Sequence, residues 1–213
     1  IKWTGQRTIT IVGVQELKKI QYKVMFDRIE AGTYMIASAL TGGNLKIINI
    51  NPKIINTEIN ILKKIGASIK IKNKELNIKG SNKIKNIKLK TSPYPGFPTD
   101  LQAQLMVLLC KANGRSEIIE KIFENRFMHA LELNRMGAKI NILGNKAIVN
   151  GNVNFKAAEL MATDLRASVS LILAALSAKG KSIINRIYHL DRGYEKIEQK
   201  LRSVGASIRR ISE

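Results

Sequence analysis

A short phrase occurs three times in the chain, and this internal repeat constrains the fold more than any other feature. It reads Leu-x-x-x-Gly-Ala-x-Ile, with glycines 71 and 68 residues apart at Gly66, Gly137 and Gly205. A second marker is an aspartate that opens an apolar helical stretch, and it occurs as Asp27, Asp100 and Asp164. Two markers in the same order, three times over, predict three copies of one structural unit.

Each unit is expected to contain two different helices joined and followed by short strands. The stretches Leu101–Ala112 and Leu165–Ala178 are apolar on most faces, which is typical of a buried helix. The second helix is amphipathic, and in the third unit its apolar face consists of Tyr194, Ile197, Leu201 and Val204. Three α/β units of this kind predict one domain with pseudo-threefold symmetry, in which the first helices lie inside and the sheets outside.

The arrangement of the first helices has a chemical consequence. If they run parallel, their N-termini share one face, and the free N–H groups and partial positive charge there favour anions. Asp27, Asp100 and Asp164 would lie on this face. They are either functional carboxylates or ordinary N-cap or first-turn residues of their helices.

Three segments contain candidate functional residues. Residues 92–100 contain three prolines and a glycine, which predicts a stiff loop that positions Asp100 at a helix start. Arg126 and Arg192 precede second helices, whereas Arg166 lies in a first helical turn, where a cation opposes the helix dipole. Three guanidiniums gathered at helix N-termini would bind phosphate or carboxylate, and a single one would only form a surface ion pair.

The formal net charge of +20 permits two interpretations. Many lysines neutralise phosphates in nucleic-acid-binding proteins. However, the excess is concentrated in residues 70–90, where Lys alternates with apolar residues as on a half-buried strand. Aromatic residues make up only 5% of the chain, and no nucleic-acid-binding motif is present. We therefore attribute the charge to compositional bias and expect no nucleic-acid partner.

Other candidate groups are weak. Cys110 lies in an apolar helical run, so we expect a buried, inert thiol. His129 and His189 lack the spacing of metal ligands, and no P-loop or dinucleotide-binding fingerprint occurs, so neither a metal nor a cofactor is expected. No apolar run approaches the about 18 residues of a membrane span, and no secretory signal is visible. We expect a cytoplasmic protein without a membrane partner.

Four segments together are highly specific: Phe97–Gln104, Phe123–His129, Ala162–Ser168 and Arg186–Glu195. They closely resemble the UDP-N-acetylglucosamine 1-carboxyvinyltransferase family of enolpyruvyl transferases, and the resemblance covers nearly the whole chain. It implies an inside-out α/β barrel with three βαβαββ-like repeats. It also implies transfer of enolpyruvate from phosphoenolpyruvate to the 3′-hydroxyl of UDP-N-acetylglucosamine by addition and elimination, with release of phosphate. This is the first committed step of peptidoglycan synthesis, on which cell-wall growth, shape and division depend.

The resemblance also implies roles for individual residues. Asp100 would bind the sugar 3′-hydroxyl, and it would either take its proton or only position it. Ile122 would contact the UDP-sugar, and Asp164 would be a further carboxylate of the cleft. Three arginines would surround the enolpyruvyl and phosphate groups, and these are Arg126, Arg166 and Arg192. Asp100 and Arg192 would be the catalytic pair.

The family enzyme has two such domains and about twice this length, so the chain corresponds to its C-terminal half. Residues 1–24 resemble the end of the first domain and the crossover, and residues 25–213 would form the second domain, with repeats at about 25–90, 91–155 and 156–213. The reactive cysteine loop of the family lies in the first domain, so Cys110 does not take its role. The chain would be a fragment, one piece of a split enzyme or a non-catalytic remnant. It is expected to be inactive alone, and 5-enolpyruvylshikimate-3-phosphate synthase is the alternative enzyme.

Overall fold

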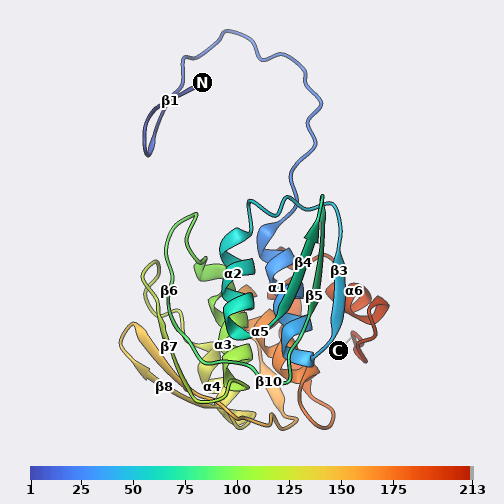
Figure 1. The fold of residues 1–213 in the computed structure, drawn as a ribbon. Helices are drawn as coiled ribbons and strands as arrows, with labels where there is room; N and C mark the ends of the chain where they lie inside the picture. Colours follow the sequence, from blue (N-terminus) through green and yellow to red (C-terminus); the bar gives the residue numbers. More distant parts are fainter. Residues whose placement is uncertain (212–213) are drawn as a thin grey trace.

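Residues 1–27 form an arm that leaves the rest of the chain in the computed structural model, which describes residues 1–211 (Figure 1). The arm begins with an antiparallel hairpin of β1 (Lys2–Gly5) and β2 (Thr8–Thr10). It continues without regular structure, and every residue from 1 to 25 is exposed. The domain boundary after residue 24 falls within this arm and stays a prediction.

Three successive groups of elements follow the arm. The first consists of α1 (Arg28–Thr41), β3 (Asn44–Ile47), α2 (Asn56–Ile65), β4 (Ser68–Lys72) and β5 (Glu75–Lys79). The second consists of β6 (Lys88–Lys90), the 3-10 turn η1 (Thr99–Leu101), α3 (Gln102–Cys110), β7 (Arg115–Ile119), α4 (His129–Arg135), β8 (Lys139–Leu143) and β9 (Lys146–Asn150). The third consists of β10 (Glu159–Met161), α5 (Leu165–Leu176), β11 (Ile183–Asn185), the 3-10 turn η2 (Ile187–Arg192) and α6 (Ile197–Ser203).

The sheets of the first two units share one topology. In the order β3-β5-β4 all pairs are antiparallel, and β7-β9-β8 repeats this order in the second unit, where β6 adds a parallel strand beside β7. The registers agree as well, because Asn44 and Ser68 both pair with Lys79, as Arg115 and Lys139 both pair with Asn150. The third unit has only the parallel pair β10-β11 among the described residues. The strands expected after its second helix are not found up to residue 211.

The first helix of each unit lies inside, as the repeat predicts. α1, α3 and α5 pack on one another in the centre, and the strands lie outside them (Figure 1). Every residue of α3 is buried, which agrees with its apolar sequence. α1 packs so closely against η1 at Gly32 that a side chain there would displace the buried Leu101. A Cβ at Gly32 would lie 2.4 Å from Leu101 Cδ1.

The repeated Gly-Ala phrase ends the second helix of each unit. Its glycines have φ values of 121°, 93° and 99° at Gly66, Gly137 and Gly205, a region that side chains rarely adopt. One part of the helix prediction is wrong. Val204 is 55% exposed, whereas Tyr194, Ile197 and Leu201 are buried. α6 ends at Ser203, so Val204 no longer follows its apolar face.

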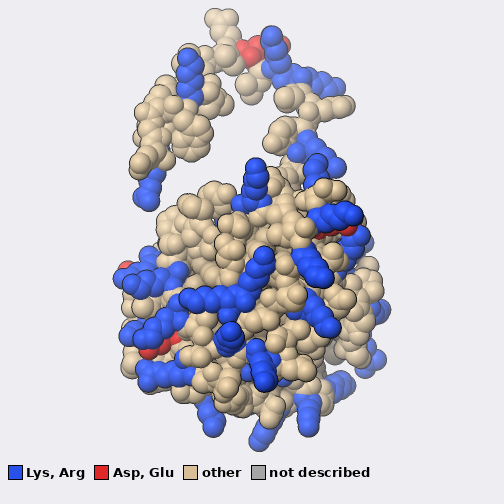
Figure 2. All heavy atoms as spheres, in the orientation of Figure 1, with Lys and Arg blue, Asp and Glu red and all other residues tan. Residues whose placement is uncertain are grey.

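Lys and Arg side chains are spread over the face of the molecule that Figure 2 shows. In β5 the inward side chains of Leu76 and Ile78 are fully buried, and in β4 the lysines Lys70 and Lys72 are exposed. This alternation confirms the interpretation of the lysine-rich segment as strands with a solvated face. Within residues 1–211, no helix combines the length and the apolar character that a membrane crossing requires.

Candidate active site

The proline-rich loop before Asp100 is held in place at several points. The Ser92 N–H donates to the Phe97 carbonyl at 3.0 Å, and the Phe97 side chain is buried. From the first unit, Arg28 donates to the Gly96 carbonyl at 3.5 Å. The loop leads directly into η1, whose middle residue is Asp100. A stiff loop with these anchors fixes where the carboxylate lies.

Asp100 is bound by two arginines from different units. Its Oδ1 accepts a hydrogen bond from Arg126 Nη2 at 2.7 Å, and its Oδ2 lies 2.9 Å from Arg166 Nη2. The carboxylate side chain is 35% exposed, so the pair of contacts is open to a ligand from one side. Charge-assisted contacts of this kind are stronger than neutral ones, and they orient both partners.

Arg126 owes its position to the turn before α4. Asn125 has a φ of 51°, and asparagine is among the few residues that adopt this left-handed conformation readily. The turn brings the Arg126 guanidinium to 4.9 Å from the centre of the Phe123 ring. Phe127 is buried and anchors the other side of the turn. The guanidinium therefore reaches Asp100 with its planar face supported by an aromatic ring.

Asp164 and Arg166 begin α5. Asp164 Oδ1 accepts hydrogen bonds from the backbone N–H groups of Arg166 at 2.8 Å and Ala167 at 3.0 Å, so it is an N-cap. The Arg166 side chain then leaves the first turn toward Asp100. Its charge near the positive helix end costs some stability, which the contact with Asp100 offsets.

Arg192 ends η2 and reaches the same region. The residue after Arg192, Gly193, lies close to Leu165 at the start of α5. A Cβ at Gly193 would lie 2.9 Å from Leu165 Cδ2. This close approach places Arg192 beside the start of α5. Within residues 1–211, no ion pair of Arg192 with an acidic side chain is found. Among the described residues, Asp100 forms ion pairs with Arg126 and Arg166 but not with Arg192.

One pocket gathers these side chains. It has a volume of about 410 Å³ and is lined by Asp100, Asn125, Arg126, Met128, His129, Asp164, Leu165, Arg166 and Arg192. Five of the six predicted site residues therefore meet in one place. The sixth, Ile122, is 38% exposed and does not line this pocket. Three guanidiniums against two carboxylates give the pocket a net positive charge, which suits an anionic ligand.

His129 is a pocket residue that the sequence did not reveal. Its side chain is buried, and burial lowers the pKa of its imidazole to about 4. At neutral pH the ring is therefore uncharged, and it adds a polar group without adding a positive charge. In the sequence, His129 ends the segment Phe123–His129, three residues after Arg126, but nothing there distinguishes it as a pocket residue.

The three repeated aspartates do not have the same role. Asp27 caps α1 through hydrogen bonds from Ile29 N and Glu30 N, and Asp164 caps α5 in the same way. Asp100 makes no such cap, because it lies inside η1, and its oxygens face the arginines. Asp27 and Asp164 are thus N-caps, whereas Asp100 shows the other expected placement, in a first helical turn.

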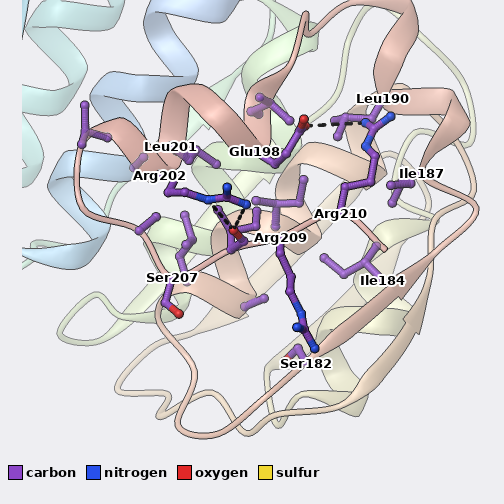
Figure 3. A pocket seen from close by; sticks show the side chains of 18 of the residues that line it. Ser182, Ile184, Ile187, Leu190, Glu198, Leu201, Arg202, Ser207, Arg209 and Arg210 are labelled. Atoms are coloured by element: carbon purple, nitrogen blue, oxygen red, sulfur yellow. Dashed lines mark hydrogen bonds and ion pairs between the residues drawn. The ribbon is translucent and has the colours of Figure 1, made fainter. Parts of the chain in front are cut away.

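A larger groove of about 1620 Å³ lies between α1, α5, β11 and α6, on another part of the domain (Figure 3). It runs beside β11, where the first two units carry their antiparallel strands. Two arginines of this groove already have partners. Arg202 donates a hydrogen bond to the Ile208 carbonyl, and Arg210 donates one to Asp191 Oδ1. None of the predicted site residues lines this groove, so its size does not make it the active site.

Cys110 is buried in α3, and burial raises the pKa of its thiol to about 12. This confirms the prediction of a buried thiol, which is unreactive because it stays protonated. Among the described residues, no group of three or more His, Cys, Asp or Glu side chains could hold a metal ion.

The sequence profile described as EPSP synthase (3-phosphoshikimate 1-carboxyvinyltransferase) matches residues 1–201. The chain belongs to this family. UDP-N-acetylglucosamine 1-carboxyvinyltransferase from Pelagibacter ubique is 73% identical over 212 residues, which is 100% of this chain and 51% of that protein. The enzyme of that name from Bartonella henselae is 52% identical, over 99% of this chain and 50% of its own length. The chain thus spans about half the length of these relatives of the EPSP synthase family.

Solved structures of the EPSP synthase family show the same fold. The enolpyruvyl transferase NikO from Streptomyces tendae has a TM-score of 0.79 and 28% identity, over 87% of this chain and 44% of NikO. EPSP synthase from Acinetobacter baumannii has a TM-score of 0.75 and 21% identity, over 89% of this chain and 48% of that chain. The predicted fold class, an enolpyruvyl transferase domain built from α/β repeats, is confirmed.

Proposed function

We propose that this chain is the C-terminal half of a UDP-N-acetylglucosamine 1-carboxyvinyltransferase. The observation that carries the proposal is the Asp100 carboxylate between Arg126 and Arg166, in a pocket that also holds Arg192. High identity to enzymes of that name supports the choice of sugar nucleotide. The whole protein would act in the cytoplasm, in peptidoglycan synthesis, and would influence cell shape and division.

The residues of the pocket suit an addition and elimination reaction. The sugar 3′-hydroxyl loses its proton to a base as its oxygen bonds to C2 of phosphoenolpyruvate, and C3 gains a proton from an acid or from water. The C2–O bond to phosphate then breaks and C3 loses a proton, which restores the double bond. Asp100 Oδ1 accepts one hydrogen bond from Arg126, and Oδ2 forms an ion pair with Arg166, so free lone pairs remain to which the substrate hydroxyl can donate.

The arginines would act on the negative charges of the donor. A guanidinium binds carboxylate or phosphate through two N–H groups in a fixed geometry, and preorganised donors of this kind stabilise the charge of a departing phosphate. Arg192 is the best placed for a substrate anion, because Asp100 engages the other two. Ile122, on the loop before Phe123, would contact the sugar nucleotide, and Asp164 would form one wall of the cleft.

One domain supplies one wall of such a cleft. We infer that residues 1–24 belong to the end of a first domain and residues 25–213 to the second. A reaction that must exclude water needs both walls to close on the substrate. The chain alone would therefore be inactive, and a first domain would be its partner.

Phosphate release by the full-length protein tests the proposal. We expect release from phosphoenolpyruvate that depends on UDP-N-acetylglucosamine, and no release with shikimate 3-phosphate. Release with shikimate 3-phosphate in place of the sugar nucleotide would assign the chain to the alternative enzyme. No release with either acceptor would indicate a non-catalytic protein. The same assay on the 213-residue chain should give no turnover, and turnover there would contradict the need for a second domain.

A further inference from the structure

Glu120 is a buried carboxylate outside the pocket that four hydrogen-bond donors surround. Its side chain is only 2% exposed. Oε1 accepts from the Thr91 hydroxyl at 2.7 Å, from Ile122 N at 2.8 Å and from Phe123 N at 3.2 Å. Oε2 accepts from the Thr99 hydroxyl at 2.8 Å. Each oxygen of the buried carboxylate thus accepts at least one hydrogen bond.

These four donors come from the segments that form the site. Thr99 immediately precedes Asp100 and opens η1, whereas Thr91 follows β6 at the start of the proline-rich loop. Ile122 and Phe123 begin the segment that carries Arg126, and the Phe123 ring supports its guanidinium. Glu120 itself follows β7, the parallel neighbour of β6. One carboxylate therefore ties the segment of Asp100 to the segment of Arg126.

Glu120 forms no ion pair among the described residues. Within residues 1–211, no Lys, Arg or His side chain forms a salt bridge with it. Two hydroxyls and two backbone N–H groups stabilise it instead. Burial of a carboxylate costs free energy unless hydrogen bonds of this kind satisfy it. An apolar residue at the end of the strand would avoid this cost, so a role beyond stability is indicated for Glu120.

We propose that Glu120 is a positioning residue that fixes the distance and direction of Asp100 relative to Arg126, and this rests on the proposed function of that pair. It acts through Thr99 on one side and through Ile122 and Phe123 on the other. Displacement of reacting groups by about 1 Å can cost about 10²-fold in rate. Loss of the Glu120 hydrogen bonds therefore lowers turnover, although Glu120 lies outside the pocket.

Two substitutions in the full-length protein separate geometry from charge. In Glu120→Gln the amide oxygen can take the place of Oε1, and the amide N–H can donate to the Thr99 hydroxyl, so the network is kept. We expect kcat to stay within about threefold of the unsubstituted protein. In Glu120→Ala all four donors lose their acceptor, and we expect kcat to fall at least about 10²-fold. An equal loss in both variants would overturn the positioning role.

A double substitution shows whether the effect passes through Asp100. If it does, adding Glu120→Ala to Asp100→Asn costs little further activity, because the positioned group is already lost. A full additional loss in that background would contradict the proposal. Glu117→Gln, on the strand β7 that precedes Glu120, removes a carboxylate whose partners are Lys88 and Arg115, and it should leave kcat unchanged.

A crystal structure of full-length Glu120→Ala tests directly whether Glu120 positions Asp100 relative to Arg126. We expect the contact of Asp100 Oδ1 with Arg126 Nη2 to open from 2.7 Å. A contact that stays intact in the variant would overturn the positioning role. By contrast, absence of sugar-nucleotide-dependent phosphate release from the unsubstituted protein would overturn only the proposed function.

Discussion

Asp100 and Arg166 belong to different units of the repeat, and their side chains meet at 2.9 Å. Arg126 completes the contact from within the unit of Asp100. The carboxylate is thus held between two cations that approach it from different parts of the sequence. Its orientation depends on how the second and third units pack.

Asp100→Asn tests the chemical role of the carboxylate in the full-length protein. The amide keeps the shape but cannot accept a proton, and a lost general base costs at least about 10²-fold. We expect a loss of this size in kcat. Asp191→Asn, whose side chain pairs with Arg210 away from the pocket, should leave kcat near normal. Retention of most of the kcat in Asp100→Asn would show that Asp100 only positions the hydroxyl.

Arg166→Lys tests the requirement for a planar guanidinium. Lysine keeps the charge but loses the fork of donors that binds an anion and Asp100 together. We expect kcat/KM for phosphoenolpyruvate to fall at least about tenfold. Arg135→Lys, on the surface of α4 in a pair with Glu132, is the matched control, and its kinetics should not change. Equal kinetics for both variants would contradict a role of Arg166 in the site.

Tyr194→Phe tests the polar cluster at the centre of the three helices. The buried Tyr194 hydroxyl lies 2.8 Å from Thr33 Oγ1 and 3.3 Å from Gln104 Nε2. Its removal leaves buried polar groups without a partner, so the free energy of unfolding should fall by about 1–3 kcal/mol. Urea unfolding measures this. Tyr188→Phe removes the hydroxyl of a ring that is 56% exposed, and a change of similar size there would argue against the cluster.

His129 gives the protein a pH-dependent stability. Its folded-state pKa of about 4 lies below the ordinary histidine value of about 6.5, so the unfolded chain binds more protons between these pH values. The free energy of unfolding therefore decreases as the pH falls from about 6.5 to about 4, in total by about 3 kcal/mol. Unfolding at pH 7 and pH 5 should show a smaller difference in His129→Gln than in the unsubstituted protein. An unchanged difference would contradict this cause.

The repeat and its buried helices could be predicted from the sequence because local pattern determines them. The apolar run of α3 and the glycines after the second helices are examples, and the structure confirms both. The predicted burial of Val204 is wrong because a helical spacing of apolar residues does not show where the helix ends. α6 ends at Ser203, one residue earlier.

The pocket could be predicted in part, for a different reason. Asp100, Arg126 and Arg166 stood out by residue type and position, but their contacts join residues 26 and 66 apart, which only the packing of units determines. His129 and Glu120 were missed because their importance lies in burial and partners. A single glutamate after a strand has no sequence signal that separates it from a solvated one.

The contact of Asp100 with Arg166 makes the pocket a property of how two units dock. Neither the second nor the third unit contains both side chains. The pocket therefore exists only where these units are packed against each other. A variant whose units are intact but loosely docked would keep its secondary structure and lose its active site.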